Sequence, residues 1–333
     1  MESMMCGITE IRIGRNLLED VLPERERSRA VVLTQPGAEP VGRQLAARLT
    51  APVRVLPDGE RAKTISVAEE TYRWLDEVDV DRHGTLVAVG GGTVSDLAGF
   101  VASTYLRGIE LVTVPTTLLA AVDASIGGKT AVNLKAKNLV GTFWEPTRVI
   151  VDLDLLDLLP KERIRDGMAE IVKAGFIGDE QLVSLLERDG LGASLSAAVR
   201  AAVAVKAGIV SRDPREHGER ALLNYGHTVG HAIERVVSVS HGEAVAVGMV
   251  VASVLSERML GFRDRDRHRA LIERLELPTA VAADLDPVLR MVRSDKKRIR
   301  GGMRMVLLER IGSPLLVEVP EAAVSRVLSD TLL

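Results

Sequence analysis

The sequence of 333 residues lacks the features that mark secreted, membrane-spanning or nucleic-acid-binding proteins. Its one cysteine, Cys6, permits no intramolecular disulfide, and its start, MESMMCGITEIRI, has no apolar stretch of a signal peptide. The longest apolar run, residues 244–255, is shorter than the roughly 20 residues that a membrane-spanning helix needs. The 43 basic and 46 acidic side chains nearly cancel, so no overall field attracts nucleic acid or an anionic membrane. We therefore expect a cytoplasmic protein that binds neither.

Apolar residues, in contrast, are plentiful. They make up 46% of the chain, and the mean hydropathy is +0.13. A chain of this length and composition can fill two hydrophobic cores. Two domains are therefore expected, the first over residues 1–157 and the second over residues 158–333.

The first domain is expected to be an α/β domain with a mainly parallel sheet. Short β-branched runs alternate with helical patterns, and strands that are apolar on both faces require helices on both sides. Ser66 and Glu69 have the spacing of a capping box and predict that a helix begins at Ser66. The expected strands are residues 30–33, 52–56, 86–89, 111–114 and 149–151.

The second domain is expected to be mostly α-helical, because segments of helical length dominate from about Pro160 onward. Two extended runs near its end, residues 304–308 and 315–319, predict a small hairpin. The expected helices are residues 162–177, 193–210, 225–237, 243–260 and 265–275.

A glycine-rich turn, Gly90, Gly91 and Gly92, lies between an expected strand and a helix that we expect to begin near Ser95. Glycine lets the backbone approach a ligand closely, and a helix N-terminus offers N–H groups to phosphate. The turn lacks the third glycine of the dinucleotide fingerprint, so alone it is also consistent with a plain strand-to-helix turn. The GGKT sequence ending at Thr130 is not a P-loop, because Asp123 stands where the first glycine is required.

Polar and basic residues crowd the segment from Asp123 to Asn138. Ammonium groups that converge with amides suit a phosphate ligand, although a cluster of lysines is more often a solvated loop. The residues concerned are Asp123, Lys129, Asn133, Lys135, Lys137 and Asn138.

Three of the six histidines, His227, His231 and His241, fall in one stretch. The first two are four residues apart in a helical segment and project from the same face. Three protein ligands with an open position are typical of catalytic zinc, and Glu170 is the candidate carboxylate because it stands on an otherwise apolar helix. The spacing leaves open which three residues bind, and histidines also cluster without a metal.

Nine motifs occur in the order found in the 3-dehydroquinate synthase family of sugar phosphate cyclases, from about residue 10 to the end, and the chain resembles that family throughout. They are GGGTVSDLAGF, YLRG, PTT, DASIGGKTAVN, KN, GMAEIVKAGFI, RALLNYGHTVGHAIE, HGEAVAVGM and SDKK. The resemblance implies a homodimer of the shikimate pathway with NAD in the first domain and Zn²⁺ or Co²⁺ on Glu170, His227 and His241. His231 is then left for proton transfer, and Arg107 reaches the phosphate in the neighbouring subunit.

The same resemblance assigns the contacts of the cofactor and the substrate. The NAD contacts are Asp58, Glu60, Lys63, Gly91, Gly92, Thr93, Val94, Ser95, Asp96, Thr116, Thr117, Lys129, Lys137, Leu155, Leu156, Asp157 and Leu158. The substrate contacts are Asp123, Lys129, Asn138, Lys173, Lys206, Arg220, Asn224, His231 and Lys297. The NLKAKN loop and the turn between His231 and His241 are shorter than is usual in the family.

The implied reaction converts 3-deoxy-arabino-heptulosonate 7-phosphate to 3-dehydroquinate and phosphate, with transient oxidation by NAD, elimination, reduction and aldol closure. Sister cyclases that act on sedoheptulose 7-phosphate or an amino analogue are the nearest alternatives. A metal-dependent polyol dehydrogenase would share the architecture but would not need so many cationic side chains around an anion. A metabolite-binding protein without catalysis would not need a metal site.

Overall fold

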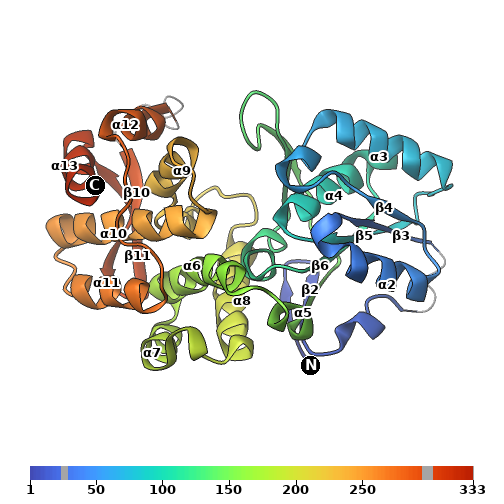
Figure 1. The fold of residues 1–333 in the computed structure, drawn as a ribbon, viewed down its shortest axis with the longest axis horizontal. Coiled ribbons are helices and arrows are strands. Elements are labelled where there is room, and N and C mark those ends of the chain that lie inside the picture. The colour runs from blue at the N-terminus through green and yellow to red at the C-terminus, as the bar shows by residue number, and fades with distance from the viewer. Residues whose placement is uncertain (24–28, 295–302, 333) are drawn as a thin grey trace. The chain divides into compact units, whose positions relative to one another are not determined.

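The computed structural model describes residues 1–23, 29–294 and 303–332. Its contacts divide the chain into unit 1, Met1–Pro160, and unit 2, Lys161–Leu333. This division lies three residues beyond the domain boundary that we expected after residue 157. Figure 1 shows the elements of both units.

Unit 1 is built on a seven-stranded sheet in the order β1-β2-β9-β6-β5-β3-β4. Neighbouring strands are parallel except for β1 and β2, which form an antiparallel pair at one edge. The strands are β1 (Glu2–Cys6), β2 (Thr9–Gly14), β3 (Ala30–Thr34), β4 (Val53–Val55), β5 (Thr85–Gly90), β6 (Glu110–Pro115) and β9 (Arg148–Asp152). A separate hairpin pairs β7 (Lys129–Val132) with β8 (Val140–Phe143).

Both faces of this sheet are buried, as its apolar strands require. Leu86 and Ala88 of β5 face a core completed by α3 (Ile65–Glu77) and α4 (Gly92–Thr104). Val87 and Val89 face a second core completed by α2 (Glu39–Leu49). Figure 1 shows α2 on one side of the sheet and α3 and α4 on the other. The shorter helical segments are η1 (Leu17–Glu19), η2 (Pro36–Ala38), η3 (Gly59–Ala62), η4 (Tyr105–Arg107), η5 (Ala120–Ala124) and α5 (Leu153–Asp157).

In unit 1, two helix starts differ from the sequence predictions. Helix α3 begins at Ile65, and its cap is Thr64, whose Oγ1 accepts a hydrogen bond from the Val67 N–H at 3.2 Å. The capping box predicted at Ser66 is therefore wrong. Helix α4 begins at Gly92, three residues before the predicted start. The first turn of α4 thus follows the glycine-rich turn without a linker.

Unit 2 is mostly helical, as predicted. One hairpin, β10 (Met303–Arg310) with β11 (Ser313–Val319), accompanies the helices, and its turn is shorter than predicted. The helices are α6 (Lys161–Gly178), α7 (Glu180–Asp189), α8 (Leu195–Arg212), α9 (His227–Val236), α10 (His241–Leu260), α11 (Arg265–Arg274), α12 (Leu285–Ser294) and α13 (Glu321–Thr331). Two 3₁₀ segments are η6 (Gly190–Gly192) and η7 (Glu219–Asn224).

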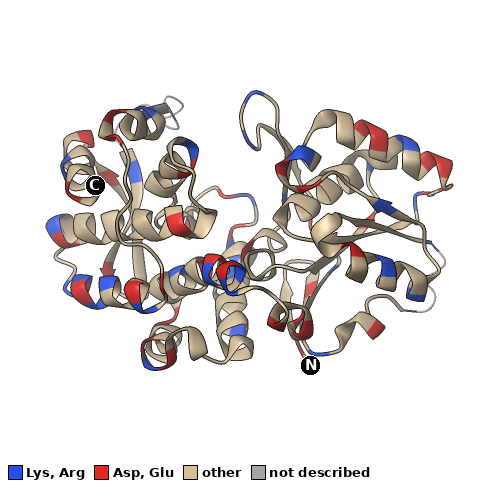
Figure 2. Cartoon of the chain, in the orientation of Figure 1, with Lys and Arg blue, Asp and Glu red and all other residues tan. Residues whose placement is uncertain are grey.

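Helix α10 is the centre of unit 2. It contacts α6, α9, α13 and β10, and its residues between Glu243 and Glu257 carry no charge. Figure 2 shows this uncharged stretch, in contrast to the charged outer face of α3 in unit 1. None of the helices in the described part of the chain is long and apolar enough to span a membrane.

Candidate active site

A carboxylate from the middle of α6 meets two histidines that stand at the first residues of α9 and α10. Glu170 lies on α6 and is only 3% exposed. Its Oε2 forms an ion pair with Lys173 Nζ one turn later on the same helix. Its Oε1 lies 3.4 Å from His227 Nε2 and 3.5 Å from His241 Nε2. Among the described residues, this buried Oε1 has no hydrogen-bond partner.

Close packing of helices brings these three side chains together. A Cβ atom on Gly248 of α10 would lie 2.0 Å from the Gly226 carbonyl oxygen and 2.9 Å from the Gly230 nitrogen, so only glycine allows α10 to approach α9 this closely. A capping box of Ser240 and Glu243 fixes the start of α10 at His241. Asp166 Oδ1 then accepts the Gly242 N–H at 2.6 Å, which ties α6 to this start, one turn before Glu170.

Hydrogen bonds fix which nitrogen of each histidine faces Glu170. His227 Nδ1 lies 3.1 Å from the Tyr225 carbonyl oxygen, to which it can only donate. His241 Nδ1 lies 3.1 Å from Glu234 Oε2. Both Nε2 atoms are thereby left to act as ligands, as is usual for histidines that bind a metal.

These three residues fit a divalent ion. Their ligand atoms lie within 4.8 Å of one another, and two imidazole nitrogens with one carboxylate oxygen suit zinc or cobalt. The unpartnered Glu170 Oε1 supports the same conclusion, because a buried carboxylate oxygen otherwise carries a desolvation cost. The residues that the sequence named as metal ligands are therefore brought together.

The pKa values of the three side chains also suit a site that binds a cation. Burial would raise the pKa of Glu170, but Lys173 and the two histidines hold it well below its usual value. Burial, followed by Lys173, lowers the pKa of His227 to about 3. Burial opposes protonation of His241 as well, but the nearby carboxylates of Glu170 and Glu234 raise its pKa to about 10. The cluster thus holds an ionised carboxylate, a neutral His227 and a proton on His241 that a metal ion would replace.

His231 lies beside the three candidate ligands. Its ring centroid is 5.0 Å from that of His227 and 6.1 Å from that of His241. It is not part of the group that could hold a metal within the described residues. Its expected function in proton transfer stays a prediction.

Glu234 was missed by the sequence analysis, although it lies on the same face of α9 as His227, two turns later. A carboxylate on the outer nitrogen of a histidine ligand orients the ring and raises its basicity. We expect Glu234→Gln to weaken zinc binding by roughly tenfold to a hundredfold. Competition with a chromogenic chelator measures this. Glu257→Gln, at the far end of α10, removes an ion pair with Arg265 and serves as the control. Equal zinc affinity in both variants would contradict the function assigned to Glu234.

The other predicted substrate contacts of unit 2 are mostly buried. Lys206 is buried on α8. Arg220 is only 2% exposed, and its guanidinium donates to the Pro214 carbonyl. Asn224 donates from Nδ2 to Glu216 Oε1 at 2.9 Å. Lys297 lies outside the described residues.

Asp213 holds the turn that leads to Arg220. Its carboxylate accepts N–H groups of His217, Gly218 and Arg220 at 2.8–3.0 Å, and these bonds lower its pKa to about 2. Arg220 is therefore placed by a fixed turn and is not a solvated arginine.

In unit 1, the candidate cofactor residues form a network around Lys63. This buried lysine donates to Asp96 Oδ2 at 2.5 Å and to Asn138 Oδ1 at 2.6 Å. The Asn138 N–H donates to Asn133 Oδ1 at 2.9 Å, and Asn133 Nδ2 donates to Glu60 Oε2 at 2.6 Å. Asn138, which the resemblance gave to the substrate, thus contacts Lys63, which the resemblance gave to NAD. The sequence analysis named Asn133 among the polar residues of its segment but assigned it no contact with NAD or the substrate.

Asp96 gives the network a pH dependence. Burial raises its pKa to about 6, against the opposing effect of Lys63. In the folded protein the carboxyl keeps its proton up to about pH 6, whereas in the unfolded chain it loses it near pH 3.8. Because the folded state binds more protons in this window, the contribution of Asp96 to stability is complete below about pH 4 and falls as the pH rises to about 6.

We therefore compare the unfolding free energies of the wild type and of Asp96→Asn. The excess of the wild type over the variant should fall by on the order of 2 kcal/mol between pH 4 and pH 6. Urea denaturation of both proteins without cofactor, in steps of half a pH unit, measures it. A difference that rises with pH, or that does not change, would show that the carboxyl is ionised throughout.

The glycine-rich turn lies at the carboxyl edge of the parallel sheet, where open α/β sheets bind ligands. The Thr116 N–H donates to the Gly90 carbonyl at 2.9 Å, which joins the ends of β5 and β6. A Cβ atom on Gly91 would lie 3.4 Å from Thr117 Cγ2 and 3.9 Å from Gln35 Nε2. Gln35 Oε1 is buried without a hydrogen-bond partner in the described part of the chain. We add Gln35 to the candidate cofactor contacts. The sequence signal that could have identified it is a polar residue directly after a buried strand.

The remaining predicted residues of unit 1 lie on several elements. Asp58 precedes η3, which contains Glu60, and Thr93, Val94 and Ser95 lie in the first turn of α4. Asp123 lies in η5, Lys129 begins β7, and Lys137 lies in the loop that follows β7. Leu155, Leu156 and Asp157 lie in α5, and Leu158 follows it, highly exposed.

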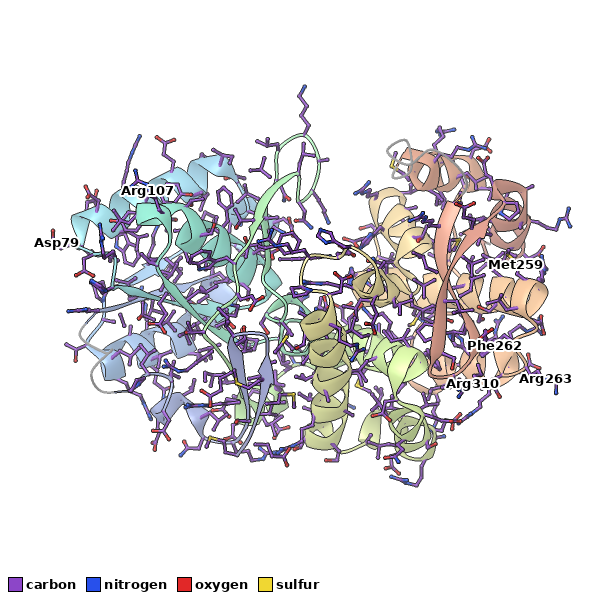
Figure 3. The ribbon with its side chains drawn as sticks, turned by 180° about the vertical axis from the view of Figure 1, so that it is seen from behind. Asp79, Arg107, Met259, Phe262, Arg263 and Arg310 are labelled. Atoms are coloured by element: carbon purple, nitrogen blue, oxygen red, sulfur yellow. The ribbon has the colours of Figure 1, made fainter. Side chains whose placement is uncertain are left out.

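Arg107 lies on an exposed segment with an unusual backbone, on the outside of unit 1 in Figure 3. Leu106 has φ 49°, Arg107 φ 69° and Gly108 φ 125°. Positive φ is rare for leucine and arginine, and strain of this kind persists at functional sites.

The sequence matches family models over most of its length. Residues 53–166 match the 3-dehydroquinate synthase N-terminal model, and residues 167–298 match the C-terminal model. A 3-dehydroquinate synthase from Paenarthrobacter aurescens is 44% identical over 94% of this chain and 92% of its own. A 3-dehydroquinate synthase from Rhodococcus opacus is 42% identical over 93% of this chain and 88% of its own.

Solved structures of sister enzymes have the same fold. A 2-deoxy-scyllo-inosose synthase bound to carbaglucose-6-phosphate, NAD⁺ and Co²⁺ superposes with a TM-score of 0.90, at 28% identity over 99% of this chain and all of its own. A 2-epi-5-epi-valiolone synthase from Streptomyces hygroscopicus with NAD⁺ and Zn²⁺ gives 0.87, at 26% identity over 99% of this chain and 98% of its own. A probable glycerol dehydrogenase from Sinorhizobium meliloti, at 0.66 and 18% identity, shares the fold alone.

The fold, a group on the helical unit that could hold a metal ion and these likenesses define a sugar phosphate cyclase. Such an enzyme is a lyase, not a polyol dehydrogenase. Within this class, the chain belongs to the 3-dehydroquinate synthase family.

Proposed function

We propose that this chain converts 3-deoxy-arabino-heptulosonate 7-phosphate to 3-dehydroquinate and phosphate in the shikimate pathway. The observation that carries the proposal is the group of Glu170, His227 and His241, within 4.8 Å of one another, in a chain 44% identical to a 3-dehydroquinate synthase. The buried Lys173, Lys206 and Arg220 supply cationic groups to unit 2. A substrate that carries both a carboxylate and a phosphate suits such a set.

Two cofactors complete the proposal. Zinc, held by Glu170, His227 and His241, supplies a Lewis acid that lowers the pKa of a substrate hydroxyl. NAD supplies a hydride acceptor that returns to its starting state in each cycle. Its proposed contacts surround the glycine-rich turn and the Lys63 network, and the N-terminus of α4 offers N–H groups to its phosphates.

The chain's own residues bind, orient and transfer protons. Lys173 neutralises the second oxygen of Glu170 and keeps that carboxylate ionised. His231, beside the ligand histidines, is the proposed relay for the hydroxyl proton. Arg220, on its fixed turn, is the proposed partner of the substrate carboxylate, because its planar fork matches two oxygens. The protein thus contributes mainly orientation and electrostatics.

We also propose a homodimer in which Arg107 reaches the phosphate in the neighbouring subunit. Two features support this proposal. The Arg107 side chain is exposed, and the backbone around it is held in positive φ at three consecutive residues. Such a backbone costs free energy. A function of Arg107 in the active site of the neighbouring subunit would explain why this cost is retained.

An assay with two sugars tests the proposed substrate. Purified protein with zinc and NAD is given either 3-deoxy-arabino-heptulosonate 7-phosphate or sedoheptulose 7-phosphate, and phosphate release and the cyclic product are followed. We expect turnover of the first sugar and strong discrimination against the second, which has no carboxylate for Arg220. Turnover of sedoheptulose 7-phosphate alone would instead indicate a sister cyclase.

A further inference from the structure

Unit 2 contains only three aromatic residues, Phe176, Tyr225 and Phe262, and all of them surround His268. The Phe176 ring stacks on the His268 ring, with centroids 3.9 Å apart and planes inclined by 21°. Tyr225 and Phe262 meet the same ring edge to face, at 5.9 Å and 6.4 Å. Phe262 follows the end of α10, where Figure 3 labels it. Such a concentration of aromatic rings around one histidine calls for an explanation.

His268 is completely buried on α11 and, among the residues that the structure describes, forms one polar contact. Its Nε2 lies 3.0 Å from the Tyr225 hydroxyl, which is itself buried. Burial lowers the pKa of His268 to about 3 and raises that of Tyr225, so both groups are neutral. His268 Nδ1 has no hydrogen-bond partner in the described part of the chain. A buried polar atom without a partner destabilises the fold, so its presence requires an explanation, such as a function of the residue.

The Tyr225 carbonyl is the group that accepts the hydrogen bond from His227 Nδ1. Tyr225 and Gly226 have φ, ψ of −56°, 125° and 80°, −26°, which are those of the central residues of a type II turn. At the Gly226 end, α10 leaves no room for a side chain, because a Cβ would lie 2.9 Å from the Val245 carbonyl. Glycine adopts positive or negative φ with equal ease, so it permits this turn without fixing it. The restraint at the other end is the side chain of Tyr225.

His268 also contacts α6, the helix that carries Glu170. Phe176, which stacks on His268, lies on α6 one turn after Lys173 and six residues after Glu170. His268 therefore links the turn before His227 to the helix that carries Glu170. These are two of the three side chains proposed to bind the metal.

We propose that His268 is a positioning residue of the metal centre. Its hydrogen bond to Tyr225 and its stacking on Phe176 hold His227 and Glu170 in the positions that metal binding requires. This proposal rests on the proposed metal site. His268 does not touch the metal ligands. It acts through the backbone carbonyl of Tyr225 and through α6.

The test measures metal binding in metal-stripped protein, without substrate. Tyr225→Phe, His268→Phe and the double variant are compared by zinc competition with a chromogenic chelator, by the visible spectrum of bound Co²⁺ and by thermal melting. We expect each single variant to weaken zinc about tenfold, the loss typical of outer-shell partners, and to alter the Co²⁺ spectrum. The double variant should bind zinc no more weakly than the singles, because all three lack the same contact. Its melting temperature should recover, because neither partner is left buried and unpaired.

A matched control separates positioning from stability. Ser256 is also completely buried in unit 2 and accepts the Leu308 N–H at 2.9 Å, in a link between α10 and β10. Ser256→Ala should lower the melting temperature and leave zinc affinity unchanged. Unchanged zinc affinity in Tyr225→Phe, or an equal loss in Ser256→Ala, would overturn the function assigned to His268. Tyr225→Phe removes a single oxygen and carries the test if His268→Phe does not fold. A wild type without zinc affinity would refute the metal site itself.

Discussion

His227→Ala is expected to lose its metal and to reduce kcat/KM by at least about 10³-fold, the equivalent of roughly 4 kcal/mol. His227 Nε2 lies 3.4 Å from Glu170 Oε1, so its removal leaves two of three protein ligands. Neither remaining side chain can replace it, because His241 Nδ1 is engaged by Glu234 and Glu170 Oε2 by Lys173. Elemental analysis and steady-state kinetics of purified protein measure both effects.

His231→Ala is the matched control for this prediction. The ring lies on the same helix and its centroid is 5.0 Å from that of His227, but it is outside the group that could hold a metal. The variant should keep its zinc and lose most of its turnover, which separates a ligand from a proton relay. Wild-type protein stripped of metal should be inactive until zinc or cobalt is added. Full activity in a sample shown to be metal-free would refute the metal site.

Arg220→Lys is expected to lower kcat/KM for the carboxylated sugar by roughly 30- to 150-fold, or about 2–3 kcal/mol. Arg220 is 2% exposed and stands on a turn fixed by Asp213. A lysine ammonium keeps the charge but lacks the planar fork that binds both oxygens of a carboxylate. Zinc content and folding should not change.

Arg212→Lys is the control, because Arg212 is exposed and forms an ion pair with Glu219 in the same segment. Exposed pairs contribute little, so this variant should keep nearly full activity. If Arg220→Lys retained full activity with the carboxylated sugar, Arg220 would not bind the carboxylate, and the argument against the sister cyclases would lose its main support.

The sequence predicted the parts of the fold that follow from long periodic patterns. The five predicted helices of unit 2 and the five predicted strands of unit 1 begin and end close to their predicted limits, whereas α7, α12 and α13 of unit 2 were not predicted. The edge strand β1 was missed because Glu2–Cys6 shows no clear alternation of apolar and polar residues, and β2 was missed although Ile11 and Ile13 alternate with polar residues. The hairpin of β7 and β8 was missed because its glycines and lysines read as a loop.

The candidate site was predictable where one motif held several residues, and less so where partners came from distant segments. His227, His231 and His241 stand in one stretch, which indicated a metal site, and the resemblance to the family selected His227 and His241 as the ligands. His268 stands between Arg267 and Arg269 in a charged helix, and its burial depends on the packing of Phe176 and Tyr225 around it. The contact of Asn138 with Lys63 spans 75 residues and could not be inferred from local pattern.

The most direct test of the proposed function is the stoichiometry of NAD. The protein with zinc is given 3-deoxy-arabino-heptulosonate 7-phosphate in large excess over NAD, while product, phosphate and NADH are followed together. Because the hydride is returned within each cycle, we expect many molecules of 3-dehydroquinate and phosphate per NAD and no accumulation of NADH. One NADH for each molecule of product would contradict the account and indicate a dehydrogenase.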